Sequence, residues 1–309
     1  MNLFMFFKIR IKNILEKFLP DRIIELFDKL MQPEYFTLKH KIKKFFLNLN
    51  PDEQEPEIVE IIDYFKKHRF SAIPYKFNKN YSASDICVYY DKNNKMPYVH
   101  HNNKRLYFPN NWDKETVKRY YNGLRIEQDK NSPHRYGKEG FSAADGDILA
   151  DIGAAEGIWS LDNIEKAGKI YLFECDEIWI KALEKTFEPW HNKTAIVNKY
   201  VSDVNNALNV TLDNFFSKDR LDFIKADIEG MEIKLLEGSK ELLKRESDLK
   251  LLLCTYHNKN DAEIIKVKLE NNGYITEYSK GYMFYIQDPE LAEPYARRGV
   301  IYAKKCPQQ

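Results

Sequence analysis

Four side chains that can bind a ligand or move a proton lie at the ends of short apolar runs. They are Asp151, Glu174, Asp227 and His257. Each run predicts a buried strand, and in an open α/β sheet ligands bind beyond the carboxyl ends of the strands. A single such residue is usually a cap for a helix or turn. Four of them on one edge predict a binding site.

The turn after the first run is built from small residues. Gly153, Ala155 and Gly157 keep side-chain bulk away from the backbone, so a ligand can approach it closely. A helix is expected to follow from Ile158, with free N–H groups facing that ligand. Glu174 comes about 20 residues later, where dinucleotide-binding-type folds grip a ribose diol. The stretch predicts a nucleoside-binding strand–turn–helix–strand unit.

The elements that position these residues alternate from Gly146 onward. We expect strands over 148–152, 169–173, 194–198, 221–226 and 249–255, and helices over 157–166, 176–188, 231–244 and 260–271. This alternation predicts an α/β fold with a mostly parallel, doubly wound sheet. Two close β-runs, 274–278 and 282–286, predict a terminal antiparallel hairpin.

The chain is expected to have three parts. Residues 1–50 form a basic amphipathic helical extension, with apolar stripes over 11–19, 23–30 and 38–49. Residues 57–140 form a small α+β cap for substrate recognition, with helices over 57–68 and 113–121 and β-runs between 70 and 112. Residues 141–309 form the nucleoside-binding domain. The basic helices can lie on an anionic membrane surface, or pack on a partner subunit or on their own domain.

Composition excludes several classes of protein. The formal net charge is +1, so no overall field favours nucleic acid. Four scattered cysteines without a C-x-x-C pair make a zinc site or a disulfide framework unexpected. No apolar run reaches the roughly 20 residues that span a bilayer. We expect a cytoplasmic protein, with peripheral contact at the inner face of the membrane as an alternative for residues 1–49.

The turn lacks a glycine that a nicotinamide cofactor would favour, and this difference indicates which cofactor the chain binds. A nicotinamide cofactor favours G-x-G-x-x-G, whose middle glycine lets the backbone touch the pyrophosphate. Ala155 stands at that position, and the neighbouring Glu156 would repel a diphosphate. S-adenosylmethionine has no phosphate and carries an ammonium and a sulfonium, which suit Asp151 and Glu156. The sequence therefore favours the methyl donor.

Several motifs together resemble the FkbM family of S-adenosylmethionine-dependent methyltransferases. They are Asp151-Ile-Gly-Ala-Ala-Glu-Gly-Ile-Trp-Ser160, Leu172-Phe-Glu174, Thr211-Leu-Asp213, Phe223-Ile-Lys-Ala-Asp-Ile-Glu-Gly230 and Cys254-Thr-Tyr-His257. The resemblance is specific over about residues 147 to 258 and does not cover residues 1–60. Many members have Asn-Ile where this chain has Ala155-Glu156, and Glu-Pro where it has Glu174-Cys175. Glu156 is expected to replace the lost Asn contact.

The resemblance implies a class I methyltransferase-like Rossmann fold and O-methyl transfer, usually to a hydroxyl of a sugar or other secreted metabolite. His257 is our first choice for the base, because an imidazole titrates near neutral pH; a structural histidine is the alternative. Asp227 and Glu229 are expected to serve catalysis, either by holding Mg²⁺ or Mn²⁺ as in catechol-type enzymes, or with Asp227 binding the acceptor and Glu229 capping a helix.

Other residues are candidates with open alternatives. Ser202 and Asp203 follow the third strand, where such folds often recognise adenine; an ordinary turn is the alternative. His134, Arg135 and Tyr136 precede the first strand, and we expect them to close over cofactor and acceptor or simply to join domains. Lys225 is expected to partner a carboxylate.

The leading hypothesis is an S-adenosylmethionine-dependent O-methyltransferase of surface glycan biosynthesis. Its acceptor would be a carbohydrate or a nucleotide- or lipid-linked sugar. The rivals are a nicotinamide oxidoreductase and a catalytically degenerate nucleoside-binding scaffold in a glycan-assembly complex.

Overall fold

The computed structural model describes residues 33–305 of the chain. Within them the chain forms two compact units, residues 33–75 with 284–295, and residues 76–283 with 296–305. The predicted parts 1–50, 57–140 and 141–309 have other boundaries and stay predictions. The helices expected over 11–19 and 23–30 lie outside the described residues.

The first unit is built on two helices. Helix α3 spans Pro33–Leu47, and α4 spans Pro56–Lys67 with Pro56 at its first turn, where a missing N–H costs nothing. Both present apolar faces, and Phe46 and Phe65 are buried with their ring centroids 6.0 Å apart. Phe284 packs on both rings, so the segment 284–295 joins this core. The helices expected over 38–49 and 57–68 are confirmed.

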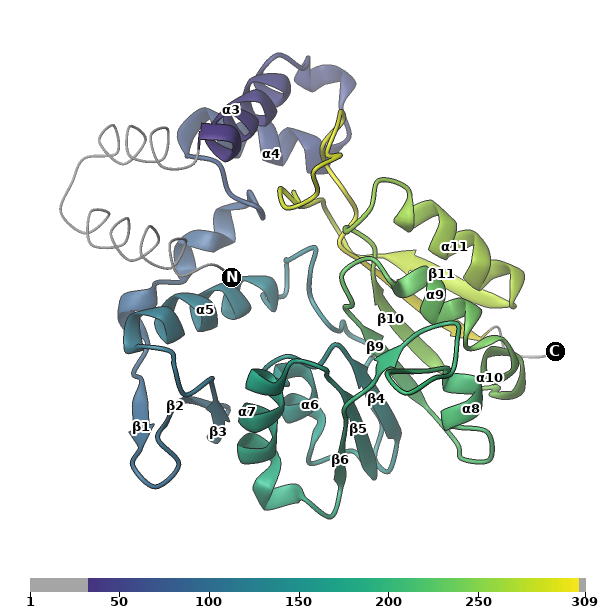
Figure 1. The fold of residues 1–309 in the computed structure, drawn as a ribbon. Coiled ribbons are helices and arrows are strands. Elements are labelled where there is room, and N and C mark those ends of the chain that lie inside the picture. Colours follow the sequence, from purple (N-terminus) through teal and green to yellow (C-terminus); the bar gives the residue numbers. More distant parts are fainter. Residues whose placement is uncertain (1–32, 306–309) are drawn as a thin grey trace. The chain divides into compact units, whose positions relative to one another are not determined.

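The second unit contains a seven-stranded sheet in the order β11-β12-β10-β9-β4-β5-β6 (Figure 1). Five neighbouring strands are parallel: β10, β9, β4, β5 and β6, which span Lys250–Cys254, Phe223–Ala226, Ile148–Ile152, Lys169–Phe173 and Thr194–Val197. The buried, nearly continuous apolar runs of β4, β9 and β10 are typical of strands covered on both faces. The predicted doubly wound α/β fold is confirmed.

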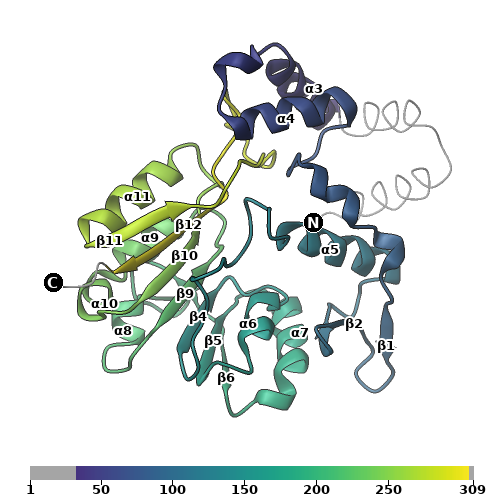
Figure 2. The ribbon, with the colours of Figure 1, turned by 180° about the vertical axis from the view of Figure 1, so that it is seen from behind.

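Helices cover both faces of this sheet. Helices α6 (Ile158–Asn163) and α7 (Glu177–Phe187) lie on one side, and α9 (Glu232–Glu237), α10 (Lys240–Arg245) and α11 (Asp261–Asn271) lie on the other (Figures 1 and 2). A short helix, α8 (Leu212–Phe215), begins at Thr211, whose side chain accepts a hydrogen bond from Asn214 N. The main apolar core forms between β9, β10 and the second group of helices.

The helix predicted over 231–244 is instead two helices. The break falls at Gly238, whose added Cβ would lie 2.0 Å from the carbonyl oxygen of Ser202. Only a glycine fits beside that carbonyl, and its own N–H bonds back to Lys234 and Leu235 to close α9. Close packing therefore ends the first helix where the apolar period alone would continue it.

The terminal antiparallel pair exists, but its second strand was predicted wrongly. Strand β11 (Tyr274–Tyr278) pairs with β12 (Val300–Lys305), and the residues expected to form the second strand, 282–286, form none. Strand β12 lies between β10 and β11, where four of its side chains, from Val300 to Ala303, are buried. A central strand buries both faces, so this run outcompetes the nearer one.

A small antiparallel sheet precedes the large one in the second unit. Strands β1 (Tyr89–Asp91), β2 (Met96–His101) and β3 (Lys104–Tyr107) confirm the expected β-rich region, although the run expected at Tyr75–Phe77 leads into a 3-10 helix, Lys76–Asn80. Tyr107 N donates to Thr186 Oγ1 at 3.0 Å, which ties β3 to α7. Helix α5 (Lys114–Glu127) starts at its cap Asp113 and runs beyond the predicted end at residue 121.

Among residues 33–305, none of the helices combines the length and the apolar character that a membrane span needs.

Candidate active site

The turn between β4 and α6 is fixed by close packing. Gly153 has a φ of 71°, and a Cβ there would lie 2.1 Å from the carbonyl oxygen of Asp227. Gly157, with a φ of 78°, would meet Leu183 and Phe187. Ala155 also has a positive φ, 47°. The two glycines let the backbone pass a strand end and α7, which is a structural reason for them beyond access for a ligand.

Asp151 is a buried anchor for this turn. It is fully buried, and Lys225 Nζ lies 2.9 Å from its Oδ1 while Ser160 Oγ donates to its Oδ2 at 2.6 Å. Lys225 Nζ also donates to the carbonyl oxygen of Gly153 at 2.9 Å. Burial by itself would lower the pKa of Lys225, but the charges of Asp151 and Asp227 raise it above its usual value. Lys225 is thus the carboxylate partner that its position predicted.

Glu174 closes the turn from the neighbouring strand. One of its carboxylate oxygens accepts a hydrogen bond from Ala155 N at 2.9 Å, and the other accepts from Cys175 N and Asp176 N. These bonds hold the carboxylate at the end of β5 beside residues 153–157. Each oxygen keeps acceptor capacity, because an ionised carboxylate offers about four lone-pair sites.

A pocket opens beyond the carboxyl ends of β4 and β9. Its acidic side chains outnumber its basic ones: Glu127, Asp151, Glu156, Asp227 and Glu229 face Lys225 and His134. Tyr120, Tyr136, Trp159 and Tyr256 supply aromatic surface. An acidic, partly aromatic pocket suits a cationic ligand with flat rings and disfavours a phosphate.

Asp227 is the centre of the polar network in the pocket. Tyr136 Oη donates to its Oδ2 at 2.5 Å, and Tyr256 Oη donates to its Oδ1 at 3.1 Å. His134 Nε2 lies 3.5 Å from Oδ2, and His257 Nε2 lies 3.3 Å from Oδ1. Burial opposes ionisation, yet His134, Lys225 and His257 hold the pKa of Asp227 well below its usual range. The carboxylate is therefore ionised and ready to accept a further hydrogen bond.

His257 is buried beside Asp227 but does not itself line the pocket. Its Nδ1 is 3.3 Å from Glu232 Oε1, and its Nε2 is 3.7 Å from Glu229 Oε2. Burial would lower the pKa of His257, but the carboxylates of Glu232, Asp227 and Glu229 together raise it. Its assignment as the base stays a prediction.

Glu156 forms the opposite wall of the pocket. Tyr120 Oη, on α5, donates to Glu156 Oε2 at 2.8 Å. Burial raises the pKa of Glu156 to about 7, against the hydrogen bond from Tyr120 and the charge of Lys225. The side chain therefore exchanges its proton near neutral pH, and a bound cation would favour the ionised form.

Six predicted site residues do not line this pocket, namely Gly157, Glu174, Ser202, Asp203, Arg135 and His257. Ser202 is buried with its Oγ donating to Asp203 Oδ1, and its carbonyl oxygen faces Gly238. Arg135 contributes a backbone carbonyl that accepts from Tyr302 Oη at 2.7 Å. The roles of Ser202, Asp203 and Arg135 stay predictions. By contrast, Tyr136, His134, Asp227 and Glu229 come together in the pocket as expected.

Sequence reasoning missed four residues of the site, namely Tyr120, Glu127, Glu232 and Tyr256. Tyr120 and Glu127 are seven residues apart on α5, so helical spacing places them on one face. This spacing can be read from the sequence, but it places Glu127 on the helix only if the helix extends beyond residue 121, its predicted end. Tyr256 and Glu232 gave no separate signal in the sequence, because they lie close to His257 and Glu229, which were already candidate site residues.

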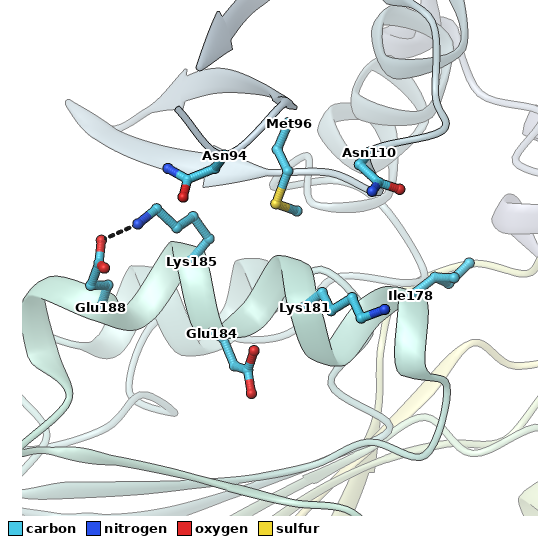
Figure 3. Close-up of a pocket in the computed structure, with 8 residues that line it drawn as sticks. All are labelled: Asn94, Met96, Asn110, Ile178, Lys181, Glu184, Lys185 and Glu188. Carbon is cyan, nitrogen blue, oxygen red and sulfur yellow. Dashed lines mark hydrogen bonds and ion pairs between the residues drawn. The ribbon is translucent and has the colours of Figure 1, made fainter. Parts of the chain in front are cut away.

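A second hollow lies between the small sheet and α7 (Figure 3). Its polar side chains include Asn94, Lys181 and Glu184, and Lys185 donates to Glu188 at 2.5 Å. It has neither the paired histidines nor the buried carboxylates of the first pocket. The chemistry of the described residues therefore centres on Asp227.

The strand order and the pocket beyond β4 and β9 define a class I methyltransferase-like domain. Residues 205–276 match the model of the family described as the methyltransferase FkbM domain. The family model thus matches the segment that holds Asp227, Glu229 and His257, and the family is the one that the motifs indicated.

Solved structures of methyltransferases are similar at low identity. The methyltransferase FkbM from Methylobacillus flagellatus KT is 17% identical with a TM-score of 0.44, over 62% of this chain and 53% of that one. This chain thus matches about half the length of that protein. The precorrin-6y C5,15-methyltransferase of Geobacter metallireducens GS-15 is 15% identical, over 53% and 82%, with a TM-score of 0.37. An rRNA methylase of Streptococcus thermophilus is 15% identical, over 53% and 89%, with a TM-score of 0.38. Similarities at this level indicate nothing about substrate. No match was found among curated proteins.

Proposed function

We propose that the protein is an S-adenosylmethionine-dependent O-methyltransferase that acts on a hydroxyl of a sugar or glycan in surface polysaccharide biosynthesis. The observation that carries the proposal is the gathering of Asp227, Glu229 and His257 beside an acidic pocket, within a segment that matches the FkbM methyltransferases. The acceptor would be a free carbohydrate or a nucleotide- or lipid-linked sugar.

The donor would occupy the side of the pocket formed by residues 153–157. Glu174, held at the turn by three backbone N–H groups, is placed to accept hydrogen bonds from the ribose diol. Glu156 would face the ammonium or sulfonium, whose charge its carboxylate offsets. The same carboxylate would repel the pyrophosphate of a nicotinamide cofactor, which supports the methyl donor over that rival.

The acceptor would bind at Asp227. The acceptor hydroxyl would donate to this carboxylate, and bound S-adenosylmethionine would supply the methyl group: the O–C bond would form as the C–S bond breaks, which leaves S-adenosylhomocysteine. The hydroxyl proton passes to the Asp227–His257 pair. The contribution of the chain is mainly alignment, since Tyr136 and Tyr256 fix the carboxylate by two hydrogen bonds. In the alternative in which Asp227 and Glu229 hold a divalent cation, that ion would acidify the acceptor hydroxyl in place of His257.

A binding experiment tests the donor. S-adenosylhomocysteine should raise the melting temperature of the full chain, and NAD should not. Stabilisation by NAD alone would favour the oxidoreductase.

A transfer experiment tests the reaction. Radiolabelled methyl groups should appear on hydroxyl-bearing glycan acceptors, and Asp227→Asn should abolish transfer. The matched control is Asp145→Asn, at an exposed position outside the pocket. Binding of S-adenosylhomocysteine without transfer to a panel of sugar acceptors would favour the scaffold.

A further inference from the structure

We propose that Asp227, Glu232 and His257 bind a divalent cation at the acceptor end of the pocket. The role of this cation rests on the proposed function, because the ion would contact the acceptor hydroxyl at that site. Its binding can be measured without any turnover.

The three side chains already have the spacing of metal ligands. One ligand atom from each lies within 4.8 Å of the other two. His257 Nε2 is 3.3 Å from Asp227 Oδ1, and His257 Nδ1 is 3.3 Å from Glu232 Oε1. Nitrogen and oxygen ligands bound at about 2.0–2.2 Å to one ion lie about 3 to 3.5 Å apart. The two contacts use different ring nitrogens, and one ion takes only one of them, so the side chains must rotate to bring one nitrogen and both carboxylates onto the same ion.

Glu232 provides the independent sign of a missing partner. Its side chain is 0% exposed, and its Oε1 accepts a hydrogen bond from Ile228 N at 2.9 Å. Its Oε2 is buried with no hydrogen-bond partner among the described residues. A buried carboxylate oxygen without a donor is costly. A cation bound beside His257 would supply the missing interaction.

The surrounding backbone holds the ligands in place. Arg297, itself buried, donates to the carbonyl oxygens of Tyr256 at 2.8 Å and His257 at 2.6 Å, which fixes the segment after β10. Glu229, whose Oε2 is 3.7 Å from His257 Nε2, lies on the open side and can add a further ligand. Ligands held this way lose little entropy on binding an ion.

The donor set indicates the kind of ion. Two carboxylates and one imidazole suit a divalent ion such as Mn²⁺. A neighbouring cluster, His134, Asp227 and Cys254, includes a buried thiol and would favour a softer ion. The two clusters share Asp227, so variants of the other residues separate them. As a cation ligand, His257 would no longer take up the hydroxyl proton, so its two roles exclude each other.

The test is a titration of the chelator-treated full chain with Mn²⁺, followed by electron paramagnetic resonance of the free ion. We expect one bound Mn²⁺ per chain, and an affinity at least about tenfold weaker in Glu232→Gln and in His257→Asn. Glu241→Gln, at an exposed position on α10, is the control and should bind as the unmodified chain does. Far-ultraviolet circular dichroism and the thermal unfolding transition report whether each variant is folded.

The outcomes are distinct. Unchanged Mn²⁺ affinity in both Glu232→Gln and His257→Asn overturns the site. Loss of binding in Cys254→Ser but not in Glu232→Gln assigns the ion to the other cluster and overturns it as well. A chain that binds S-adenosylhomocysteine but no Mn²⁺ also overturns the site, while it leaves the proposed methyl transfer and its His257 base standing. Failure to bind S-adenosylhomocysteine counts against the proposed function alone.

Discussion

The hydroxyl of Tyr136 donates a 2.5 Å hydrogen bond to Asp227, although the two residues are 91 positions apart. Tyr136 belongs to the loop that precedes the parallel sheet, and Asp227 follows β9. Burial raises the pKa of Tyr136 well above its usual value, so the phenol stays a donor throughout the physiological range. The loop thus orients the Asp227 carboxylate, which lines the pocket.

Removal of this donor tests its role. In Tyr136→Phe the ring remains but Asp227 loses one hydrogen bond, and we expect kcat to fall about 10- to 100-fold, as the loss of a bond to a charged group implies. The melting shift caused by S-adenosylhomocysteine should change little. Tyr278→Phe is the matched control, because Tyr278 Oη donates to a backbone carbonyl, that of Ala262, on α11. A Tyr136→Phe variant with unchanged kcat would contradict the assignment.

The Lys225–Asp151 pair makes a prediction about stability. Both side chains are buried, so Lys225→Met leaves the carboxylate without its cation and should lower the free energy of unfolding by about 3–5 kcal/mol. The double variant Lys225→Met/Asp151→Asn should regain part of that loss, because no unpaired charge remains. Urea unfolding measures all three chains. Equal stability of the single and double variants would mean that the pair is not coupled.

The sequence was enough to predict the parallel part of the sheet, because its five strands are apolar runs separated by helical spacing. It was not enough to predict the antiparallel edge of the sheet, which β11 and β12 form. Strand β12 lies beyond the segment 284–295, which packs in the other unit, so its pairing with β11 is set by a contact that spans a detour in the chain. The turn residues Ser279-Lys-Gly281 favoured pairing of β11 with the nearer run, residues 282–286. Gly238 shows the same limit, since only the carbonyl of Ser202 reveals why the helix stops there.

The candidate site was predictable where its residues end strands. Asp151, Glu174, Asp227 and His257 lie at or just beyond the ends of strands, as topology predicts, and their roles stay predictions. Tyr120 and Tyr256 could not be predicted as site residues. They belong to the site because their hydroxyls donate to Glu156 and Asp227, and these contacts are visible only in the structure. Periodicity places a side chain on a face but does not say what it meets.

Two glycines in turns make it possible to measure backbone strain separately from steric overlap. Gly153 and Gly273 both have a positive φ, but a Cβ would collide with the Asp227 carbonyl in the first and meet open space in the second. Gly273→Ala should cost about 1 kcal/mol from backbone strain alone. Gly153→Ala should cost about 3 kcal/mol or more, because steric overlap adds to the strain. Equal losses in urea unfolding would show that the close approach to Asp227 has no energetic weight.

Glu156 links stability and donor binding to pH. Its pKa is about 7 in the folded chain and 4.5 in the reference state, so the folded protein holds this proton more tightly. The resulting stabilisation, about 3 kcal/mol, is present below pH 4.5 and is lost as the pH rises through 7. Glu156→Gln cannot titrate, so the difference in unfolding free energy between the two chains should follow this curve.

The same carboxyl should make donor binding stronger as the pH rises. The groups that face it are Tyr120, Lys225 and Glu127, of which Lys225 alone is cationic and is already paired with Asp151. A sulfonium or ammonium brings a new positive charge, so it should lower the pKa of Glu156 and release a proton on binding. Calorimetry of S-adenosylmethionine in buffers of different ionisation enthalpy measures that proton directly. We expect up to one proton released near pH 7 by the unmodified chain and none attributable to this site in Glu156→Gln. Equal proton release by the two chains would remove Glu156 from the donor site.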